Sequence, residues 1–247
     1  MQKTALKLPR DSGTPVHKIR PKWVDVLLRL DPFCLITTMM VLLTGNLSLF
    51  KRGWPVTARL GIAVDRGHNP IPWVAYSAFD FLDNWAAKNP NAHIFEYGVG
   101  QSTLWWAARA KHITVVEHDE RWIKAYQDKL PDNVTLHHKM YNSGYEEVPL
   151  ASKKKFDLIM VDGMNRPACI PHAIKALKKG GLLIWDDSHY PRYAKHLQKL
   201  RDDGWQETIF EDHGPVKMRK TRMSVLEETA TSRKQFQDIT VSPLTQG

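Results

Sequence analysis

Short runs of β-branched and aromatic residues alternate with longer amphipathic stretches through the central part of the chain. The short runs have the composition of buried strands, and the longer stretches place apolar residues at helical spacing. Strands that alternate with helices form βαβ units, whose parallel strands are covered by helices on both faces. We therefore expect strands at 94–97, 113–116, 134–138, 156–161 and 182–185, and helices at 102–110, 120–130 and 171–178.

The segments that flank this alternation follow other patterns. Aromatic residues spaced along one helical face predict an amphipathic helix at 73–87, ahead of the first strand. Two strand-like runs at 206–210 and 223–226, with the turn sequence His213-Gly214-Pro215 between them, predict an antiparallel pair. The predicted fold is a Rossmann-like, doubly wound α/β sheet, mostly parallel, with a closing antiparallel strand pair and an N-terminal helical extension.

Glycine, proline and charge divide the chain further. Residues 1–22 combine prolines with charges and lack apolar periodicity, which predicts a mobile basic arm. We interpret 23–72 as an apolar helical extension and connection, 73–228 as the catalytic domain, and 229–247, rich in Ser, Thr and Gln, as a flexible tail. A chain of 247 residues has room for one large α/β domain with such an extension.

Charge and hydropathy leave open how the N-terminal segment relates to membranes. The net charge is +9, and residues 1–22 hold six basic side chains against one acidic. The uncharged run 32–50 approaches the ~20 apolar residues that cross a bilayer, but polar residues dilute it. Packing on the core, interfacial anchoring through residues 1–50 and a true span are the alternatives. No cleavable signal is evident, and the two cysteines form no CxxC pair, so we expect a cytoplasmic protein, with membrane association left open.

A glycine-containing turn follows the first predicted strand and leads directly into a helix. Gly98 and Gly100 stand where open α/β sheets bind ligands, because glycine lets the backbone approach a ligand closely. Thr103 occupies the position of the third glycine in a dinucleotide fingerprint. Glu117 ends the second strand, where an acid can accept both hydroxyls of a ribose. These residues predict a nucleoside cofactor that need not carry phosphate.

The same residues resemble the class I S-adenosylmethionine-dependent methyltransferases over roughly residues 70–227. Residues 95–100, Phe-Glu-Tyr-Gly-Val-Gly, look like that family's first motif, and Glu117 looks like its ribose acid. Asp162 matches the acidic end of its fourth strand, and 177–181 match the turn before its fifth. The chain is also similar to a bacterial subgroup of uncertain substrate through Ile71-Pro72-Trp73 with Tyr76, Gln101 to Trp106, and Glu117-His118-Asp119.

The resemblance implies S-adenosylmethionine as the cofactor and assigns residues to it. Glu96 would orient the methionine amino group, partly through water, and the backbone at Gly98 and Gly100 would lie against the cofactor. Tyr141, just after the third strand, would border the adenine. The implied cofactor contacts are Glu96, Gly98, Gly100, Ser102, Thr103, Glu117, His118, Tyr141 and Asp162.

Acidic and imidazole side chains follow strands four and five, beside the expected cleft. Asp162, Asp186 and His189 are candidate catalytic residues, because carboxylates and histidine can take a proton from an acceptor. The chain is similar here to catechol-type O-methyltransferases, which hold a metal on an Asp after strand four and an Asp-Asn pair after strand five. That similarity implies Asp162, Asp186 and Asp187 as magnesium ligands, although Asp187 replaces the Asn. The alternative is that Asp186 and Asp187 cap a turn.

The acceptor side offers fewer signals. Trp73 and Tyr76 precede the first strand and are candidates for stacking on a substrate, with ordinary packing as the alternative. Val161-Asp162-Gly163-Met164 departs from the motif of methyltransferases that act on amines of bases, so a nucleic acid target is disfavoured. HExxH and GxSxG motifs are absent, which argues against a zinc hydrolase and an α/β-hydrolase.

The sequence therefore predicts an S-adenosylmethionine-dependent methyltransferase acting on a small-molecule or glycan-like acceptor, with O-methylation slightly favoured. An NAD-dependent oxidoreductase and a non-catalytic, membrane-attached binding protein of the same fold are the alternatives. The acceptor and the oligomeric state are not indicated.

Overall fold

The computed structural model of this protein describes residues 39, 41, 43, 47–141, 143–217 and 219–229. The predicted arm, most of the apolar run before residue 47 and all but the first residue of the predicted tail lie outside these residues, so those interpretations stay predictions. Within the described part of the chain, no helix has both the length and the hydropathy needed to cross a membrane.

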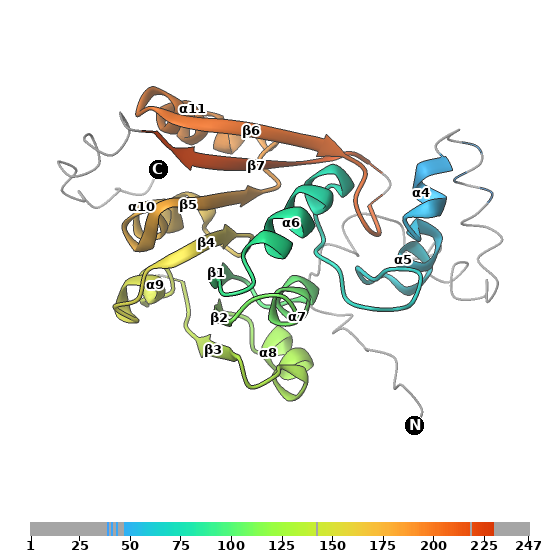
Figure 1. The fold of residues 1–247 in the computed structure, drawn as a ribbon, viewed down its shortest axis with the longest axis horizontal. Helices are drawn as coiled ribbons and strands as arrows, with labels where there is room; N and C mark the ends of the chain where they lie inside the picture. Colours follow the sequence, from blue (N-terminus) through green and yellow to red (C-terminus); the bar gives the residue numbers. More distant parts are fainter. Residues whose placement is uncertain are drawn as a thin grey trace.

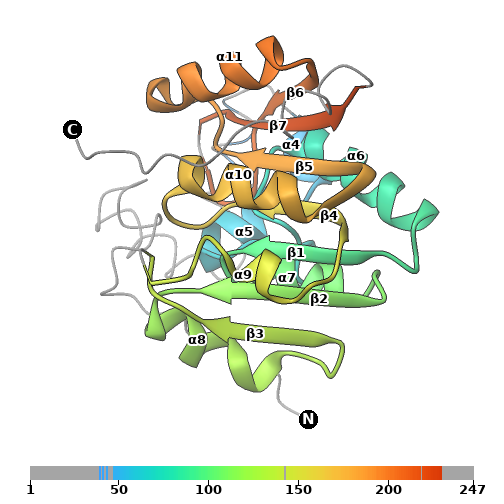
Figure 2. The same cartoon turned by 90° about the vertical axis from the view of Figure 1, so that its left-hand side faces the viewer.

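A seven-stranded sheet in the order β3-β2-β1-β4-β5-β7-β6 forms the centre of the molecule (Figures 1 and 2). Strands β1 to β5 are parallel to one another, whereas β7 runs antiparallel to both β5 and β6. The order reverses between β1 and β4, and ligands of doubly wound sheets bind at the carboxyl ends of such strands. The strands are β1 (His93–Tyr97), β2 (His112–Glu117), β3 (Val134–His138), β4 (Phe156–Val161), β5 (Leu177–Asp186), β6 (Trp205–Asp212) and β7 (Thr221–Glu228).

Helices cover both faces of this sheet. One face carries α6, α7 and α8 and the other carries α9, α10 and α11, while α4 and α5 lie beside the loop between β6 and β7 (Figures 1 and 2). The helices are α4 (Leu47–Lys51), α5 (Trp54–Leu60), α6 (Tyr76–Lys88), α7 (Gln101–Ala107), α8 (Glu120–Tyr126), α9 (Val148–Ala151), α10 (Arg166–Ala176) and α11 (Ala194–Asp202), with 3₁₀ turns at η1 (Gln127–Lys129) and η2 (Pro191–Tyr193).

The central strand β1 shows why the sheet folds as it does. Successive side chains of a strand point to opposite faces, so Ile94 joins the apolar cluster under α6 and α7 and Phe95 joins the cluster under α10. Both side chains are fully buried. Glu96 is the polar exception, because it is fully buried on the same face as Ile94. Burying a carboxyl group in a core costs free energy unless hydrogen bonds or a counter-charge compensate it.

The predicted doubly wound sheet with its antiparallel closing pair is confirmed, but some boundaries differ. The predicted turn at 177–181 lies inside β5, whose pairing with β4 shifts register between Phe156 and Leu158. The helix expected from residue 171 begins at Arg166 and contains Pro171. Pro171 is the sixth residue of this helix, so its missing N–H removes one hydrogen bond from the helix interior.

Candidate active site

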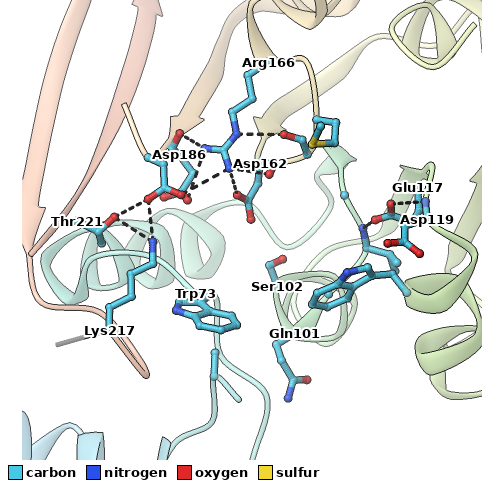
Figure 3. Close-up of a pocket in the computed structure, with 18 of the residues that line it drawn as sticks. Trp73, Gln101, Ser102, Glu117, Asp119, Asp162, Arg166, Asp186, Lys217 and Thr221 are labelled. Atoms are coloured by element: carbon cyan, nitrogen blue, oxygen red, sulfur yellow. Dashed lines mark hydrogen bonds and ion pairs between the residues drawn. The ribbon is translucent and has the colours of Figure 1, made fainter. Parts of the chain in front are cut away.

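A cavity of about 990 Å³ opens at the carboxyl ends of β1, β2, β4 and β5 (Figure 3). Its wall combines segments that lie far apart in the chain, from the N-terminal extension to the loop between β6 and β7. Predicted site residues on this wall are Trp73, Gly98, Gly100, Ser102, Glu117, His118, Asp162, Asp186, Asp187 and His189. The fold thus brings most of the predicted site together.

The turn after β1 holds two glycines that differ in their surroundings. Gly98 has φ +99°, and a Cβ atom on it would lie 3.3 Å from the Cα of Gly163. Gly100 is extended, and a Cβ atom on it would meet only the Ser102 Oγ, at 3.9 Å. Gly98 is therefore required by the fold, whereas Gly100 leaves open space on the cavity wall.

Beneath this turn, Glu96 and Thr103 form a hydrogen-bonded chain. The Gly100 N–H donates to Thr103 Oγ1 at 3.0 Å, and that hydroxyl donates to Glu96 Oε2 at 2.5 Å. Burial raises the pKa of Glu96 to about 7. Its other oxygen, Oε1, has no hydrogen-bond partner among the described residues. Glu96 and Thr103 thus support the cavity floor rather than lining its wall.

Glu117 is held rigidly at the end of β2. Its Oε2 accepts from the Val99 N–H at 3.0 Å, and its Oε1 accepts from the backbone of His118 and Asp119 at 2.7 and 2.9 Å. A carboxylate oxygen can accept two hydrogen bonds, so Oε2 keeps one for a ligand. Tyr141 is 43% exposed and lies outside the cavity wall, with its ring 5.8 Å from that of His118.

At the other end of the cavity, Arg166 contacts three carboxyl groups (Figure 3). Its Nη2 lies 2.9 Å from Asp162 Oδ1 and 3.6 Å from Asp187 Oδ2, and its Nη1 lies 3.9 Å from Asp186 Oδ2. The guanidinium also donates to the carbonyl oxygens of Asp162, Gly163 and Asp186. Arg166, at the start of α10, therefore fastens the ends of β4 and β5 to each other.

Lys217 reaches the same cluster from the loop between β6 and β7. Its Nζ lies 2.8 Å from Asp187 Oδ1, and it donates to Thr221 Oγ1 at 3.2 Å. The Thr221 hydroxyl donates in turn to Asp187 Oδ1 at 2.8 Å. Burial opposes the charge of Lys217, but Asp186 and Asp187 outweigh it and raise the pKa of the lysine.

The three carboxyl groups differ in protonation because their partners differ. Burial and the neighbouring Asp187 raise the pKa of Asp186 well above its usual range, and its Oδ1 has no partner among the described residues. For Asp187, burial is outweighed by Lys217 and Arg166, so its pKa is lowered. Burial raises the pKa of Asp162 to about 6 against the attraction of Arg166. Of the three carboxyl groups, Asp187 therefore has the strongest tendency to carry a charge and Asp186 the weakest.

The surroundings of the predicted magnesium ligands do not fit a metal ion. Arg166 occupies the space among Asp162, Asp186 and Asp187, and Lys217 neutralises Asp187 from the other side. Magnesium needs oxygen ligands arranged near an octahedron around one point. No group of three metal-binding side chains is arranged to hold an ion within the part of the chain that the structure describes.

Of the remaining predicted residues, some line the cavity wall and one lies in the hydrophobic core. His189 is exposed on the wall, its ring 4.4 Å from that of Tyr190, and burial lowers its pKa. Trp73 lies on the wall and is drawn between Lys217 and Ser102 in the view of Figure 3. Tyr76 is 3% exposed in the core and does not line the cavity, so the predicted substrate contact falls to Trp73 alone.

Residues 95–188 match a protein-family model described as a methyltransferase domain. This central segment of the chain is therefore similar to a methyltransferase domain. The match begins at the strand that enters the glycine turn and ends just beyond the acidic pair that closes β5. A search of curated proteins found no significant match.

Two solved structures have a similar fold. A protein from Klebsiella pneumoniae, provisionally named an O-methyltransferase, is 20% identical with a TM-score of 0.53, covering 74% of this chain and 90% of its own. A protein from Staphylococcus aureus, provisionally named a caffeoyl-CoA O-methyltransferase, is 16% identical with a TM-score of 0.51, covering 65% and 87%. At these identities the likeness establishes the fold alone.

Sequence reasoning missed the two cations that organise the acidic end of the cavity. Arg166 follows Asp162 by only four residues, and the two side chains form an ion pair at 2.9 Å, so this contact could have been considered from the sequence. Lys217 gave no such signal, because it stands 30 residues after Asp187 in a loop whose path depends on tertiary contacts.

Proposed function

We propose that the protein transfers a methyl group from S-adenosylmethionine to a hydroxyl of a small-molecule or glycan-like acceptor. The observation that carries the proposal is one continuous cavity with two chemically different ends. The Gly100 turn and Glu117 form one end, and Asp162, Asp186 and His189 form the other. Such a cavity holds a donor and an acceptor side by side, and alignment of reactants is the main contribution that the protein makes to an in-line displacement.

The cofactor end fits a nucleoside linked to an amino acid. Glu117 Oε2 retains hydrogen-bonding capacity for a ribose hydroxyl, and the bare face of Gly100 admits a ligand close to the backbone. The unpartnered Glu96 Oε1 offers a carboxylate for an ammonium group once a ligand or water reaches it. When bound, S-adenosylmethionine supplies the activated methyl group on a sulfonium, so the chain itself needs no nucleophile.

The acceptor end supplies groups that can orient a hydroxyl and take its proton. His189 has a lowered pKa and is therefore neutral at pH 7, which leaves its imidazole able to accept a proton. Asp162 exposes 32% of its side chain and can orient an acceptor through its carboxylate. Trp73 provides a flat surface for a ring. The O-methyltransferase names of the two structural neighbours accord with an oxygen acceptor.

Isothermal titration calorimetry with S-adenosylmethionine and S-adenosylhomocysteine tests the cofactor assignment. We expect both to bind the wild-type protein, and Glu117→Gln to weaken binding about 10- to 100-fold, as loss of a hydrogen bond to a charged group would. Glu120→Gln is the matched control, because Glu120 is exposed on α8 and pairs with Lys124. Absence of binding at high micromolar ligand would refute the proposal, and binding of NAD instead would favour an oxidoreductase.

A further inference from the structure

We infer that Arg166 and Lys217 are built-in counter-ions of the acceptor site and stand where a divalent metal would otherwise be needed. This inference rests on the proposed function for its catalytic meaning, namely that methyl transfer at this site is independent of metal. It assigns a positioning role to two residues that hold the carboxyl groups of β4 and β5 in place.

The geometry shows a closed cluster. Arg166 contacts Asp162, Asp186 and Asp187 at 2.9 to 3.9 Å, and Lys217 contacts Asp187 at 2.8 Å. The side chains of Arg166 and Lys217 are only 12% and 16% exposed. Two cations buried to this degree remain charged only where anions compensate them. The cluster therefore persists as a unit.

The cluster already contains two cations among its three carboxyl groups. Arg166 lies within 3.9 Å of all three carboxyl groups, and Lys217 lies 2.8 Å from Asp187 on its other side. A divalent cation would have to displace the guanidinium from the carboxyl groups. Coulomb repulsion from two fixed cations within a few ångströms opposes such binding.

The N-terminal extension holds Lys217 in position. Thr57 Oγ1 on α5 accepts a hydrogen bond from the Val216 N–H at 2.6 Å, and the Trp54 indole N–H donates to the Lys217 carbonyl oxygen at 3.1 Å. Thr57 and Val216 are almost fully buried. The lysine is thus fixed by its own backbone, and its place in the cluster does not depend on a bound metal.

Two measurements without cofactor or acceptor test the inference. Electron paramagnetic resonance with Mn²⁺ as the probe should show no stoichiometric binding by the wild-type protein. Thermal unfolding should show that Lys217→Met lowers the melting midpoint by several degrees, because it removes the nearest cation from Asp187 and leaves only Arg166, at 3.6 Å, to compensate its charge. Adding Asp187→Asn to Lys217→Met should recover part of that loss, and Lys217→Arg should preserve most of the midpoint.

The matched control is the exposed pair Glu120 and Lys124 on α8, 3.2 Å apart with side chains 66% and 72% exposed. Lys124→Met and Glu120→Gln should change the midpoint little. One Mn²⁺ bound per wild-type chain and lost in Asp187→Asn would overturn the inference, as would strict additivity of the Lys217 and Asp187 substitutions. Failure to bind S-adenosylmethionine would refute the proposed function and leave these results unchanged.

Discussion

Gly98 and Gly100 lie two residues apart in one turn, and we expect them to have different roles: Gly98 in the fold and Gly100 in ligand binding. Alanine at Gly98 should cost about 1–2 kcal/mol of unfolding free energy or more, because its φ is positive and its Cβ would crowd Gly163. Alanine at Gly100 should cost less than about 1 kcal/mol, since the backbone there is extended. Its methyl group should instead obstruct the cofactor and weaken S-adenosylmethionine binding at least about tenfold.

Denaturant unfolding and calorimetry on the two glycine variants separate these effects, and each variant serves as the control for the other. Unchanged cofactor affinity in Gly100→Ala would contradict the assignment of that face to the ligand. Equal losses of stability in both variants would contradict the structural distinction between them.

Glu96 should make stability depend on pH in an unusual direction. Its pKa rises from 4.5 to about 7 on folding because it is buried, so the folded protein holds a proton that the unfolded chain has lost between these values. Stability then falls as pH rises through that window. Relative to Glu96→Gln, the wild type should lose up to about 3 kcal/mol between pH 4.5 and pH 8.

Chemical denaturation of both proteins across this pH range measures the difference, with Glu120→Gln as the control for an exposed glutamate on α8. Parallel pH profiles for the wild type and Glu96→Gln would show that Glu96 is not the titrating group. A carboxyl retained at this energetic cost is in keeping with a cationic ligand, as the proposed amino-group contact requires.

At the scale of elements, α5 and the loop between β6 and β7 depend on each other. Thr57→Val keeps the shape of the side chain but leaves the buried Val216 N–H without its acceptor, which should cost about 1–3 kcal/mol. The Val216 amide should exchange with deuterium faster in this variant. Thr135→Val is the control, because Thr135 is exposed and bonds to His112. An unchanged exchange rate at Val216 would argue against the coupling.

Elements with a clear run of apolar or strand-forming side chains could be predicted from the sequence. Elements that bury only a few side chains could not. The bounds of β3 and β4 match the prediction to the residue, because turn residues delimit short runs of strand-forming side chains. The helix α11 was missed, since most of its side chains are polar and only Leu197 and Leu200 are buried. Its apolar face is too narrow to stand out from a solvated loop.

At the scale of the whole molecule, the glycine-turn end of the cavity could be foreseen from the sequence and the acidic end only in part. Glycine turns and strand-end acids recur at fixed places along βαβ units. Gly98, Gly100 and Glu117 can therefore be recognised from the local sequence alone. The environment of Asp162, Asp186 and Asp187 depends in part on Lys217. This lysine contacts Asp187 from a loop 30 residues later in the chain. Because Lys217 reaches these carboxyl groups only through the tertiary fold, the sequence alone left a metal site and a capped turn as open alternatives.

The attachment of α5 to the Lys217 loop has a consequence for how such proteins diverge. Two segments separated by more than 150 residues meet at Thr57 and Val216, so a change in either alters the fit of the other. Relatives that acquire a new acceptor should exchange the two segments together, leaving the turn at Gly98 and Gly100 intact. We therefore expect acceptor preference to depend on the N-terminal extension as well as on the closing hairpin.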